Sequence, residues 1–372
     1  MYFVHPQIKI SLENIRKIFL SFFKKEDFEK LKEFFPKKEI IFTDMGRTAF
    51  RLILKEFDLK GKEILMPAFI CDIFLSILQE YHLRPIFVDV EKETFNLSLK
   101  KIKEKLTPNT KAILLSHTFG LPLNINEIRK EISKDILIIE DCAHAFFAKT
   151  EDGPCGNLGD CAFFSLYKQF PTARGGLALL PKRKIILPKT KFSARDFLSF
   201  LNHFSFFAFL FKSFGKKIAP RVQRKEKEKE IALLNNFSLK IFFSFFDDFE
   251  KRIEKRKEIA LELKKRLEKF DFQFQETKNH IFTFFSFLTP PKINRDDFVK
   301  FLWKKRIFAT RIWKEPIVLN SLCQKIYAIL PENFPNTLEI SKRIVNLPLQ
   351  DFYQEKDVRN IVNAIENYFK KN

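Results

Sequence analysis

Short apolar runs alternate with charged stretches of helical periodicity from about residue 38 to residue 182. This alternation predicts a mostly parallel β-sheet that is covered by helices on both faces. The expected strands lie at residues 63–66, 86–90, 112–115, 136–139, 162–164 and 177–180. Because open parallel sheets bind ligands at the carboxyl ends of their strands, the residues that follow these runs are the first candidates for chemistry.

A different pattern begins at Phe246, where apolar positions recur at intervals of three, four and seven residues, with Asp247 and Asp248 near the start. It predicts a long amphipathic helix. The strand-like segment FTFFSF and helical stretches around residues 296–305 and 357–369 follow, and they predict a small α+β domain. We therefore expect a large domain at 1–245, with a Phe- and Lys-rich insertion at about 190–240, and a connecting helix with a small C-terminal domain at 246–372.

The insertion contains a Phe-rich segment at residues 197–214 that has about the length of a membrane span. Asn202, His203 and Lys212 interrupt it, which favours a buried or interfacial helix over a span. Weak contact of this segment with a membrane surface stays an open alternative. The alternating charges KEKEKE at 225–230 are most simply a solvated helix face.

The charge balance is strongly basic, with 67 Lys and Arg against 46 Asp and Glu and a net charge of +21. It favours anionic partners such as nucleotides and phosphates. No zinc finger, helix-turn-helix or aromatic RNA-binding motif accompanies it, so we expect no nucleic-acid binding. The five cysteines are scattered without a Cys-x-x-Cys pair, and the N-terminus lacks the apolar core of a secretory signal. We therefore expect no metal site and a cytoplasmic localisation.

Reactive residue types follow three of the expected strands. They are Ser116 and His117, Glu140 and Asp141, and Ser165 and Lys168. Asp141 closes the buried run ILIIED, where an unpaired carboxylate is costly, so it needs a cationic partner or caps a following helix. Gly46, in TDMGRTAF, precedes a helix whose first amides suit a phosphate, although an ordinary turn explains the glycine equally well.

Several of these segments occur together in one order. They are MGRTAF, EILMPAFICDIF, PIFVDVEKETFNL, TKAILLSHTFGLPLNINEI, IIEDCAHAFFA, GNLGDCAFFSLYKQFPTARGGLALL and RIVNLPLQDFYQEKDVRNIVNAI. This series resembles the DegT-type (DegT/DnrJ/StrS) sugar aminotransferases, which depend on pyridoxal 5'-phosphate. The resemblance implies an α/β, three-layer, aspartate-aminotransferase-like (fold type I) large domain with a mostly parallel sheet, plus a smaller C-terminal α+β domain.

Carried over by position, the resemblance implies that Lys168 is the Schiff-base lysine and that Asp141 binds the pyridine nitrogen. It also implies that His144 contacts the phenolic oxygen of the ring, and that Gly46, Arg47, Thr48 and Ser165 bind the phosphate. Five features depart from the family pattern. Arg47 replaces the usual threonine after Gly46, and Gln350 replaces the histidine of a late Leu-Pro-x-His motif. Ser165 and Lys168 are three residues apart instead of five. Cys71 stands at the position of an aromatic residue that often stacks on the cofactor ring, with Phe69 nearby. The Asn-x-Arg motif that a partner subunit supplies in the family is not recognisable, since Asn235 and Asn236 are out of register.

The implied activity is transfer of an amino group from an amino acid, glutamate first, to the keto sugar of a nucleotide sugar by a homodimer. One alternative is other lysine-dependent chemistry with the same cofactor, such as sugar dehydration. The family's dehydratases carry histidine in place of the lysine, so Lys168 favours amino transfer. Another alternative is a non-catalytic or membrane-associated scaffold on the same fold.

Overall fold

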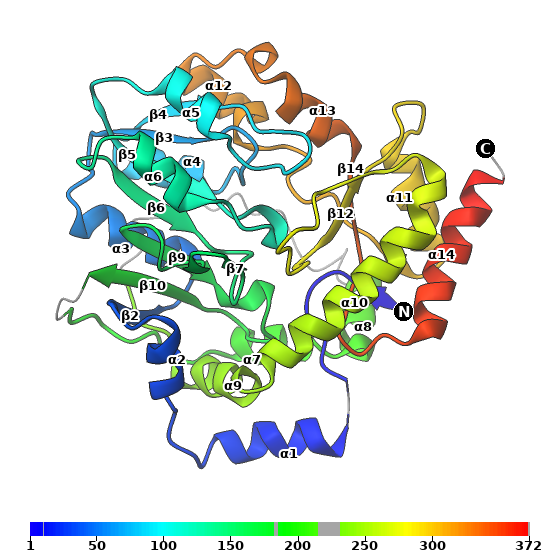
Figure 1. The fold of residues 1–372 in the computed structure, drawn as a ribbon. Coiled ribbons are helices and arrows are strands. Elements are labelled where there is room, and N and C mark those ends of the chain that lie inside the picture. The colour runs from blue at the N-terminus through cyan, green and yellow to red at the C-terminus, as the bar shows by residue number, and fades with distance from the viewer. Residues whose placement is uncertain (10, 182–184, 215–230, 371–372) are drawn as a thin grey trace.

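The computed structural model describes residues 1–9, 11–181, 185–214 and 231–370, with the side chains of 212–214 excepted. Its larger part is built on a seven-stranded sheet (Figure 1). The strands are β2 (Lys38–Thr43), β3 (Glu63–Pro67), β4 (Arg84–Val88), β5 (Thr110–Ser116), β6 (Leu137–Asp141), β9 (Cys161–Ser165) and β10 (Gly176–Pro181). Each of the six expected strands is present, and β2 is an additional one.

The strand order is β2-β10-β9-β6-β5-β3-β4. The strands from β9 to β4 are mutually parallel. By contrast, β10 is antiparallel to both of its neighbours, with Gly176 opposite Ser165 on one side and Thr43 on the other. The sheet is thus mostly parallel, as predicted. Asp141 is the last residue of β6 and Ser165 the last of β9, so both lie at the carboxyl edge of the parallel strands.

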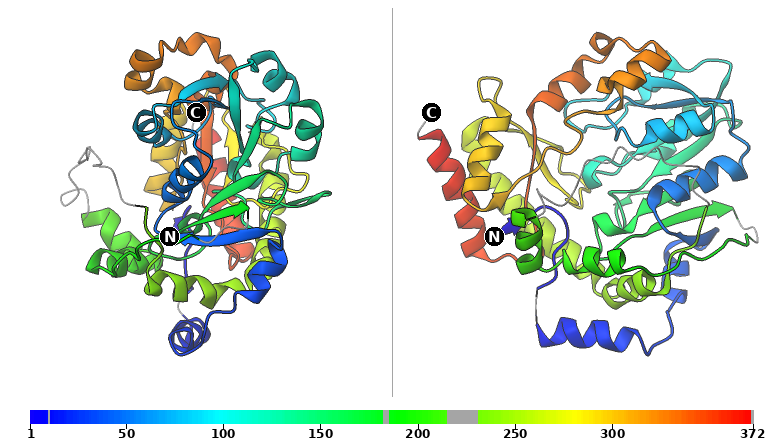
Figure 2. Two further views of the ribbon diagram at one scale, coloured as in Figure 1. Left: turned by 90° about the vertical axis from the view of Figure 1, so that its left-hand side faces the viewer. Right: turned by 180° about the vertical axis from the view of Figure 1, so that it is seen from behind.

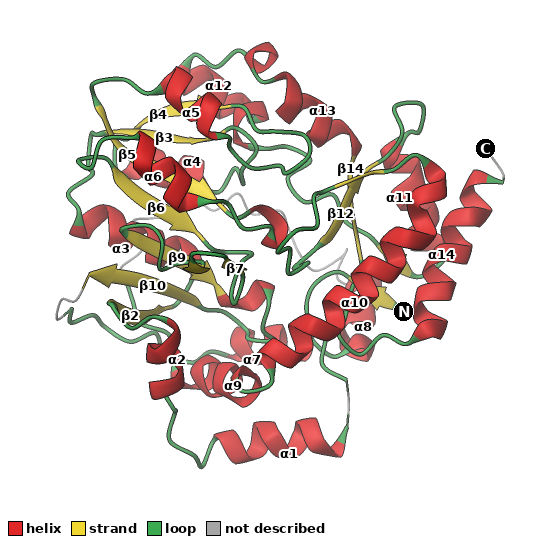
Figure 3. Cartoon of the chain, viewed as in Figure 1, coloured by secondary structure: helices red, strands yellow, loops and turns green. Residues whose placement is uncertain are grey.

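Helices cover both faces of this sheet and make a three-layer structure (Figure 3). On one face, α3 (Gly46–Glu56) and α4 (Phe74–Glu80) bury Phe50, Ile53 and Leu78. On the other face, α5 (Leu99–Lys105) and α6 (Ile125–Glu131) bury Ile102 and Ile128. A third apolar cluster joins α2 (Glu29–Phe34) and α9 (Asn236–Phe246) to the sheet near β2 and β10.

The smaller part is reached through α10 (Phe249–Leu267), which begins after its N-cap residue Asp248, close to the predicted start. It contains an antiparallel sheet of β11 (Gln273–Phe274), β12 (Phe285–Leu288) and β14 (Ile344–Leu347). Two helices, α11 (Arg295–Lys304) and α14 (Glu355–Phe369), share an apolar core with this sheet and α10. A hairpin of β7 (Lys149–Thr150) and β8 (Gly153–Pro154) lies apart from both sheets.

Two segments of the chain cross between the two parts. β1 (Tyr2–Phe3) pairs in parallel with β13 (Ile307–Phe308) of the smaller part. In the other direction, α12 (Ser321–Tyr327) and α13 (Pro335–Arg343) lie beside the large sheet near β4 (Figure 2), and Val318 and Cys323 join the core under α3 and α4. The domain boundary at 245/246 stays a prediction.

The Phe-rich segment forms two helices instead of one, α7 (Ala194–Leu201) and α8 (Ser205–Phe214). The break falls at Asn202, which caps α7, and His203, whose ring nitrogens lie 2.7 and 3.1 Å from the carbonyl oxygens of Pro6 and Thr172. Within the described ranges, no helix is long and apolar enough to cross a membrane. A further helix, α1 (Leu12–Ser21), packs beside α9, whereas the KEKEKE run at 225–230 lies outside the described residues.

Candidate active site

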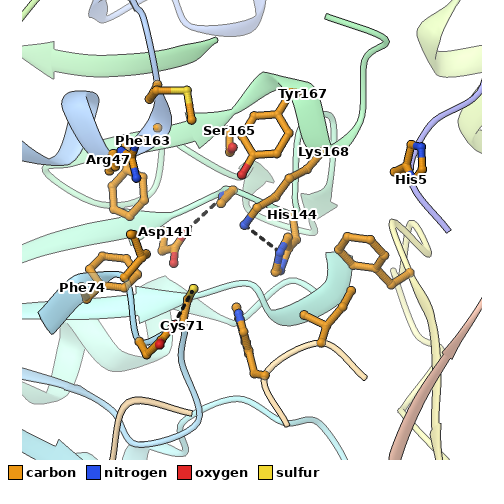
Figure 4. A pocket seen from close by; sticks show the side chains of 18 of the residues that line it. His5, Arg47, Cys71, Phe74, Asp141, His144, Phe163, Ser165, Tyr167 and Lys168 are labelled. Atoms are coloured by element: carbon orange, nitrogen blue, oxygen red, sulfur yellow. Dashed lines mark hydrogen bonds between the residues drawn. The ribbon is translucent and has the colours of Figure 1, made fainter. Parts of the chain in front are cut away.

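A cavity of about 510 Å³ opens at the carboxyl edge of the sheet (Figure 4). Most of the sequence candidates line it, namely Gly46, Arg47, Asp141, His144, Ser165 and Lys168. Thr48 is not among the lining residues, because its hydroxyl donates a hydrogen bond to Asp44. The residues at the ends of β6 and β9 therefore meet at this cavity, as strand order predicts.

Lys168 and His144 are in direct contact inside the cavity. Lys168 ends a short 3-10 turn that follows β9, and its Nζ lies 3.0 Å from His144 Nε2. His144 Nδ1 accepts the backbone N–H of Phe119 at 3.3 Å. Burial, together with the charge of Lys168, lowers the pKa of His144 well below its ordinary value, so the ring is neutral. A neutral imidazole that accepts at Nδ1 carries its proton on Nε2, so His144 presents a donor to the cavity when the Lys168 amine does not donate to that nitrogen, as when the amine is bound to an aldehyde.

Asp141 is buried beside the same lysine. Its Oδ1 accepts the backbone N–H of Ala143 at 3.0 Å, and its Oδ2 accepts the hydroxyl of Ser116 at 3.3 Å. Burial raises the pKa of the Asp141 carboxyl, while the charge of Lys168 and the Ala143 hydrogen bond oppose that shift. No helix follows β6 directly, so the side chain caps none. A cationic group in the cavity would stabilise this carboxylate.

The first turn of α3 is packed tightly against β9 and β10 by two glycines. A Cβ atom at Gly46 would lie 2.9 Å from Phe164 O and 3.2 Å from Ser165 Cβ. A Cβ atom at Gly176 would lie 2.3 Å from the Met45 carbonyl. Only glycine permits these approaches. They bring the start of α3, which includes Arg47, beside Ser165. Anions bind well at the start of a helix.

Two of the residues expected at this edge face elsewhere. Side chains alternate along a strand, so Glu140 points to the opposite face of β6 from Asp141. There Glu140 Oε2 lies 3.1 Å from His117 Nε2, and its two oxygens accept the N–H groups of Gly156 and Gly159. His117, Glu140 and Cys142 have side-chain atoms within 4.8 Å of one another, and Leu123 N donates to His117 Nδ1 at 2.9 Å. The expectation that His117 and Glu140 reach the cavity is therefore wrong.

Comparison with known proteins identifies the family to which the chain belongs. A family model described as the DegT/DnrJ/EryC1/StrS aminotransferase family matches residues 17–366. The chain belongs to this aminotransferase family. Its membership confirms the predicted family, the amino-transfer reaction and the dependence on pyridoxal phosphate.

Individual relatives agree with this assignment. The GDP-perosamine synthase of Vibrio cholerae is 22% identical over 91% of this chain and 88% of that protein. The GDP-perosamine synthase of Escherichia coli O157:H7 is 32% identical over a shorter stretch, 36% of this chain and 38% of the relative. Among solved structures, Helicobacter pylori PseC, an aminotransferase of pseudoaminic acid biosynthesis, has a TM-score of 0.76 at 17% identity, with 100% of both chains covered. This last likeness confirms the fold.

The residues of this aminotransferase fit pyridoxal phosphate. Lys168 offers a primary amine that could hold the aldehyde, and Asp141 a buried carboxylate that could face the ring nitrogen. His144 directs an N–H into the cavity, which suits the phenolic oxygen. At the start of α3, Gly46 and Arg47 line the cavity, where a phosphate would bind well. The cavity also falls in the 300–1,000 Å³ range of roughly ligand-sized sites.

Other residues that line the cavity were missed from the sequence. Trp313 comes from the smaller part, and its ring lies 5.2 Å from His144 and 5.3 Å from Phe119 between centroids. Cys71 lines the cavity where the family often has an aromatic, whereas Phe69 is buried behind, 5.3 Å from the Trp313 ring. No periodicity or motif singles out Trp313, because only the tertiary fold brings it here.

The N-terminal segment also reaches the cavity, through His5. Gln350 holds this segment in place: its Nε2 donates to Phe3 O at 2.7 Å and His5 O at 3.0 Å, and its Oε1 accepts Gln7 N at 3.1 Å. Gln350 stands where the family has histidine in its late Leu-Pro-x-His motif. Asn235 likewise has a local role, because it caps α9 by accepting the Ser238 N–H at 2.9 Å.

Proposed function

We propose that this aminotransferase moves the amino group of an amino acid, glutamate first, to the keto sugar of a nucleotide sugar. The observation that carries the proposal is the meeting of Lys168, Asp141 and His144 in one cavity beside the glycine-started helix α3. The acceptor class rests on relatives that are named as GDP-perosamine synthases and as dTDP-sugar aminotransferases. The basic charge of the chain is compatible with an anionic nucleotide.

Each residue of the site has a stated task in this proposal. Lys168 Nζ would hold the cofactor aldehyde and, as a free amine, would take and return a proton at the substrate carbon. Asp141 would keep the ring nitrogen protonated, and His144 Nε2–H would donate to the phenolic oxygen. The first turn of α3, with Gly46 and Arg47, would bind the phosphate together with Ser165, whereas Thr48 is engaged by Asp44 and takes no part. Pyridoxal phosphate, when bound, supplies an electron sink for the proton transfer.

The two rival functions make different demands on these residues. Sugar dehydration with the same cofactor would release water from the sugar and leave no amine in the product. A scaffold without catalysis would need neither an amine nor a buried carboxylate in the cavity. The presence of both Lys168 and Asp141 in the lining of one cavity favours amino transfer over both alternatives.

A nitrogen-transfer assay tests the proposal. The protein loaded with pyridoxal phosphate is incubated with 15N-glutamate and a GDP- or dTDP-linked keto sugar. The masses of the products are then measured by mass spectrometry. We expect 2-oxoglutarate and a sugar that carries 15N, with both products lost in Lys168→Ala and retained in Lys111→Ala, an exposed lysine of β5. A sugar that has lost oxygen without gaining nitrogen would support dehydration, and no conversion of any acceptor or of glutamate would favour the scaffold.

The homodimer implied by the family resemblance is also proposed, since related sites lie at a subunit boundary. Exposed apolar side chains on α7 and α8 offer a surface for it, with Phe197 47% and Phe206 58% exposed. Light scattering after size-exclusion chromatography should give twice the chain mass. A Phe197→Asp, Phe206→Asp double variant should then give the mass of one chain, and an unchanged dimer would place the interface elsewhere.

A further inference from the structure

Helix α1 carries apolar side chains on the outside of the molecule. Four of them recur at intervals of three or four residues, which places them in one stripe along α1 and the turn that ends it. They are Leu12, Ile15, Phe19 and Phe23, which are 88%, 51%, 62% and 74% exposed. The rings of Phe19 and Phe23 contact each other, with their centroids 5.0 Å apart. We call these four residues the outer stripe.

The opposite face of α1 holds the helix to the rest of the protein. Lys17 pairs with Asp248, the N-cap residue of α10, and Ile18 packs against the apolar cluster that includes α9. No residue of α1 is buried, and the helix lies at one end of the molecule, beyond α9 (Figures 1 and 2). Surface helices normally turn their apolar stripe toward the core. In α1 the arrangement is reversed, and a continuous exposed apolar surface of this kind marks an interaction site.

Basic residues surround the outer stripe. Four of them are exposed, one before the helix, one within it and two after it, namely Lys9, Arg16, Lys24 and Lys25. Glu13 is the one acidic residue of α1, and Lys17 compensates it at 3.2 Å. The surface that carries the stripe is therefore positively charged, in a chain whose net charge is +21.

The apolar surface continues from α1 onto its neighbours. The ring of Phe22, at the end of α1, lies 5.9 Å from that of Phe237 on α9, and Phe237 lies 4.9 Å from Phe192 between centroids. Phe192 is half exposed, and the adjacent Lys191 is exposed as well. The same combination of apolar and basic side chains thus extends beyond the helix.

We propose that α1 docks the protein on the surface of an anionic phospholipid bilayer. The outer stripe enters the boundary between headgroups and acyl chains, and the surrounding Lys and Arg side chains meet the lipid phosphates. The ten residues of α1 span about 15 Å, which is too short to cross a hydrocarbon core of about 30 Å, so the helix lies in the plane of the surface. The proposal goes beyond amino transfer and does not depend on it.

The charge around the stripe favours a bilayer over a second copy of this chain. In a symmetric contact through α1, each copy would set the same basic residues against those of its partner. Repulsion between like charges opposes such a contact. An anionic bilayer offers both a place for the apolar stripe and the opposite charge.

Sedimentation with vesicles is the first test. The full-length protein, loaded with pyridoxal phosphate, is mixed with vesicles of phosphatidylcholine alone or of equal parts phosphatidylcholine and phosphatidylglycerol. We expect binding to the mixed vesicles to be tighter by about tenfold or more. No binding to the mixed vesicles, or equal binding to both kinds, would overturn the proposal.

Substitutions in the outer stripe separate α1 from the diffuse positive charge of the chain. Phe19→Gln with Phe23→Gln leaves the charge unchanged and should weaken binding to the mixed vesicles by about tenfold or more. The matched control is Leu261→Gln with Leu322→Gln, which removes two half-exposed leucines from α10 and α12 and should bind as the wild type does. Equal binding by the Phe19, Phe23 variant and the wild type would show that charge alone attracts the protein, and would overturn the role of α1.

Fluorescence and light scattering examine where α1 lies. In Phe19→Trp, the mixed vesicles should shift the tryptophan emission to shorter wavelength, whereas the wild type, with tryptophans only at Trp303 and Trp313, should show no such shift. An unshifted emission from sedimented Phe19→Trp would contradict the proposal. Without lipid, the Phe19, Phe23 variant should have the mass of the wild type by light scattering. A lower mass would show that a second copy of the chain covers α1, and would also contradict the proposal.

Discussion

Replacement of Asp141 by asparagine separates the charge of this side chain from its place in the fold. The carboxylate oxygens accept hydrogen bonds from Ala143 N and Ser116 Oγ. An asparagine keeps one oxygen for Ala143, and the Ser116 hydroxyl can rotate to accept from the new amide. The substitution therefore preserves the local hydrogen bonds and removes the negative charge alone. We expect the free energy of unfolding of the cofactor-free protein to change by less than about 1 kcal/mol.

The effect on cofactor binding should be larger. A hydrogen bond to a charged group contributes about 1.5–3 kcal/mol, against about 0.5–1.5 kcal/mol for a neutral one. The difference of about 1–2 kcal/mol corresponds to about 5- to 30-fold weaker binding of pyridoxal phosphate. Amino transfer should decline further, since a ring nitrogen that is no longer held protonated withdraws electrons less effectively.

Absorbance titration with pyridoxal phosphate measures this change directly, and single-turnover reaction with glutamate measures the rate. Asp135→Asn, which removes an exposed carboxylate just before β6, is the matched control and should behave as the wild type. An Asp141→Asn variant that binds the cofactor within twofold of the wild type, at an unchanged rate, would refute the assignment of Asp141 to the ring nitrogen.

Three further substitutions test other parts of the account. Gly46→Ala puts a Cβ atom 2.9 Å from Phe164 O, so we expect the free energy of unfolding to fall by about 1–3 kcal/mol. Titration should also show at least tenfold weaker cofactor binding. Gly61→Ala, at a strained but open position, is the control and should leave cofactor binding unchanged. Because the pKa of His280 is lowered to about 3, the unfolded chain binds a proton below pH 6.5 that the folded chain does not, and stability should fall by about 3 kcal/mol between pH 7 and pH 4.5 through this residue. Urea unfolding at both pH values should show a smaller fall for His280→Gln, and equal falls would contradict the assignment. Gln350→Leu leaves Phe3 O, His5 O and Gln7 N without their partner, so limited proteolysis should cut the N-terminal segment faster, and unchanged cleavage would argue against the clamp.

Much of the candidate site could be predicted because parallel strands end at the same edge. Asp141 and Ser165 are the last residues of neighbouring strands, so their meeting follows from strand order alone. The error over Glu140 was avoidable, since adjacent residues of one strand point to opposite faces. The antiparallel direction of β10 was harder to foresee, because an apolar run has the same composition in either direction.

The rest of the site depends on contacts between distant segments. Trp313 and His5 reach the cavity from segments that are far apart in the chain, and neither lies in a periodic segment or a motif. The break between α7 and α8 coincides with His203, whose ring lies between the carbonyl oxygens of Pro6 and Thr172, and these two residues are remote in sequence. Local periodicity carries no information about such contacts.

The account depends most on Lys168 as the residue that holds the cofactor. The most direct measurement is reduction of the protein loaded with pyridoxal phosphate by sodium borohydride, followed by proteolysis and mass spectrometry of the peptides. The account predicts a single stoichiometric pyridoxyl adduct on Lys168, formed in the wild type and absent after prior exposure to glutamate. An adduct spread over surface lysines, or one that persists in Lys168→Ala, would contradict it.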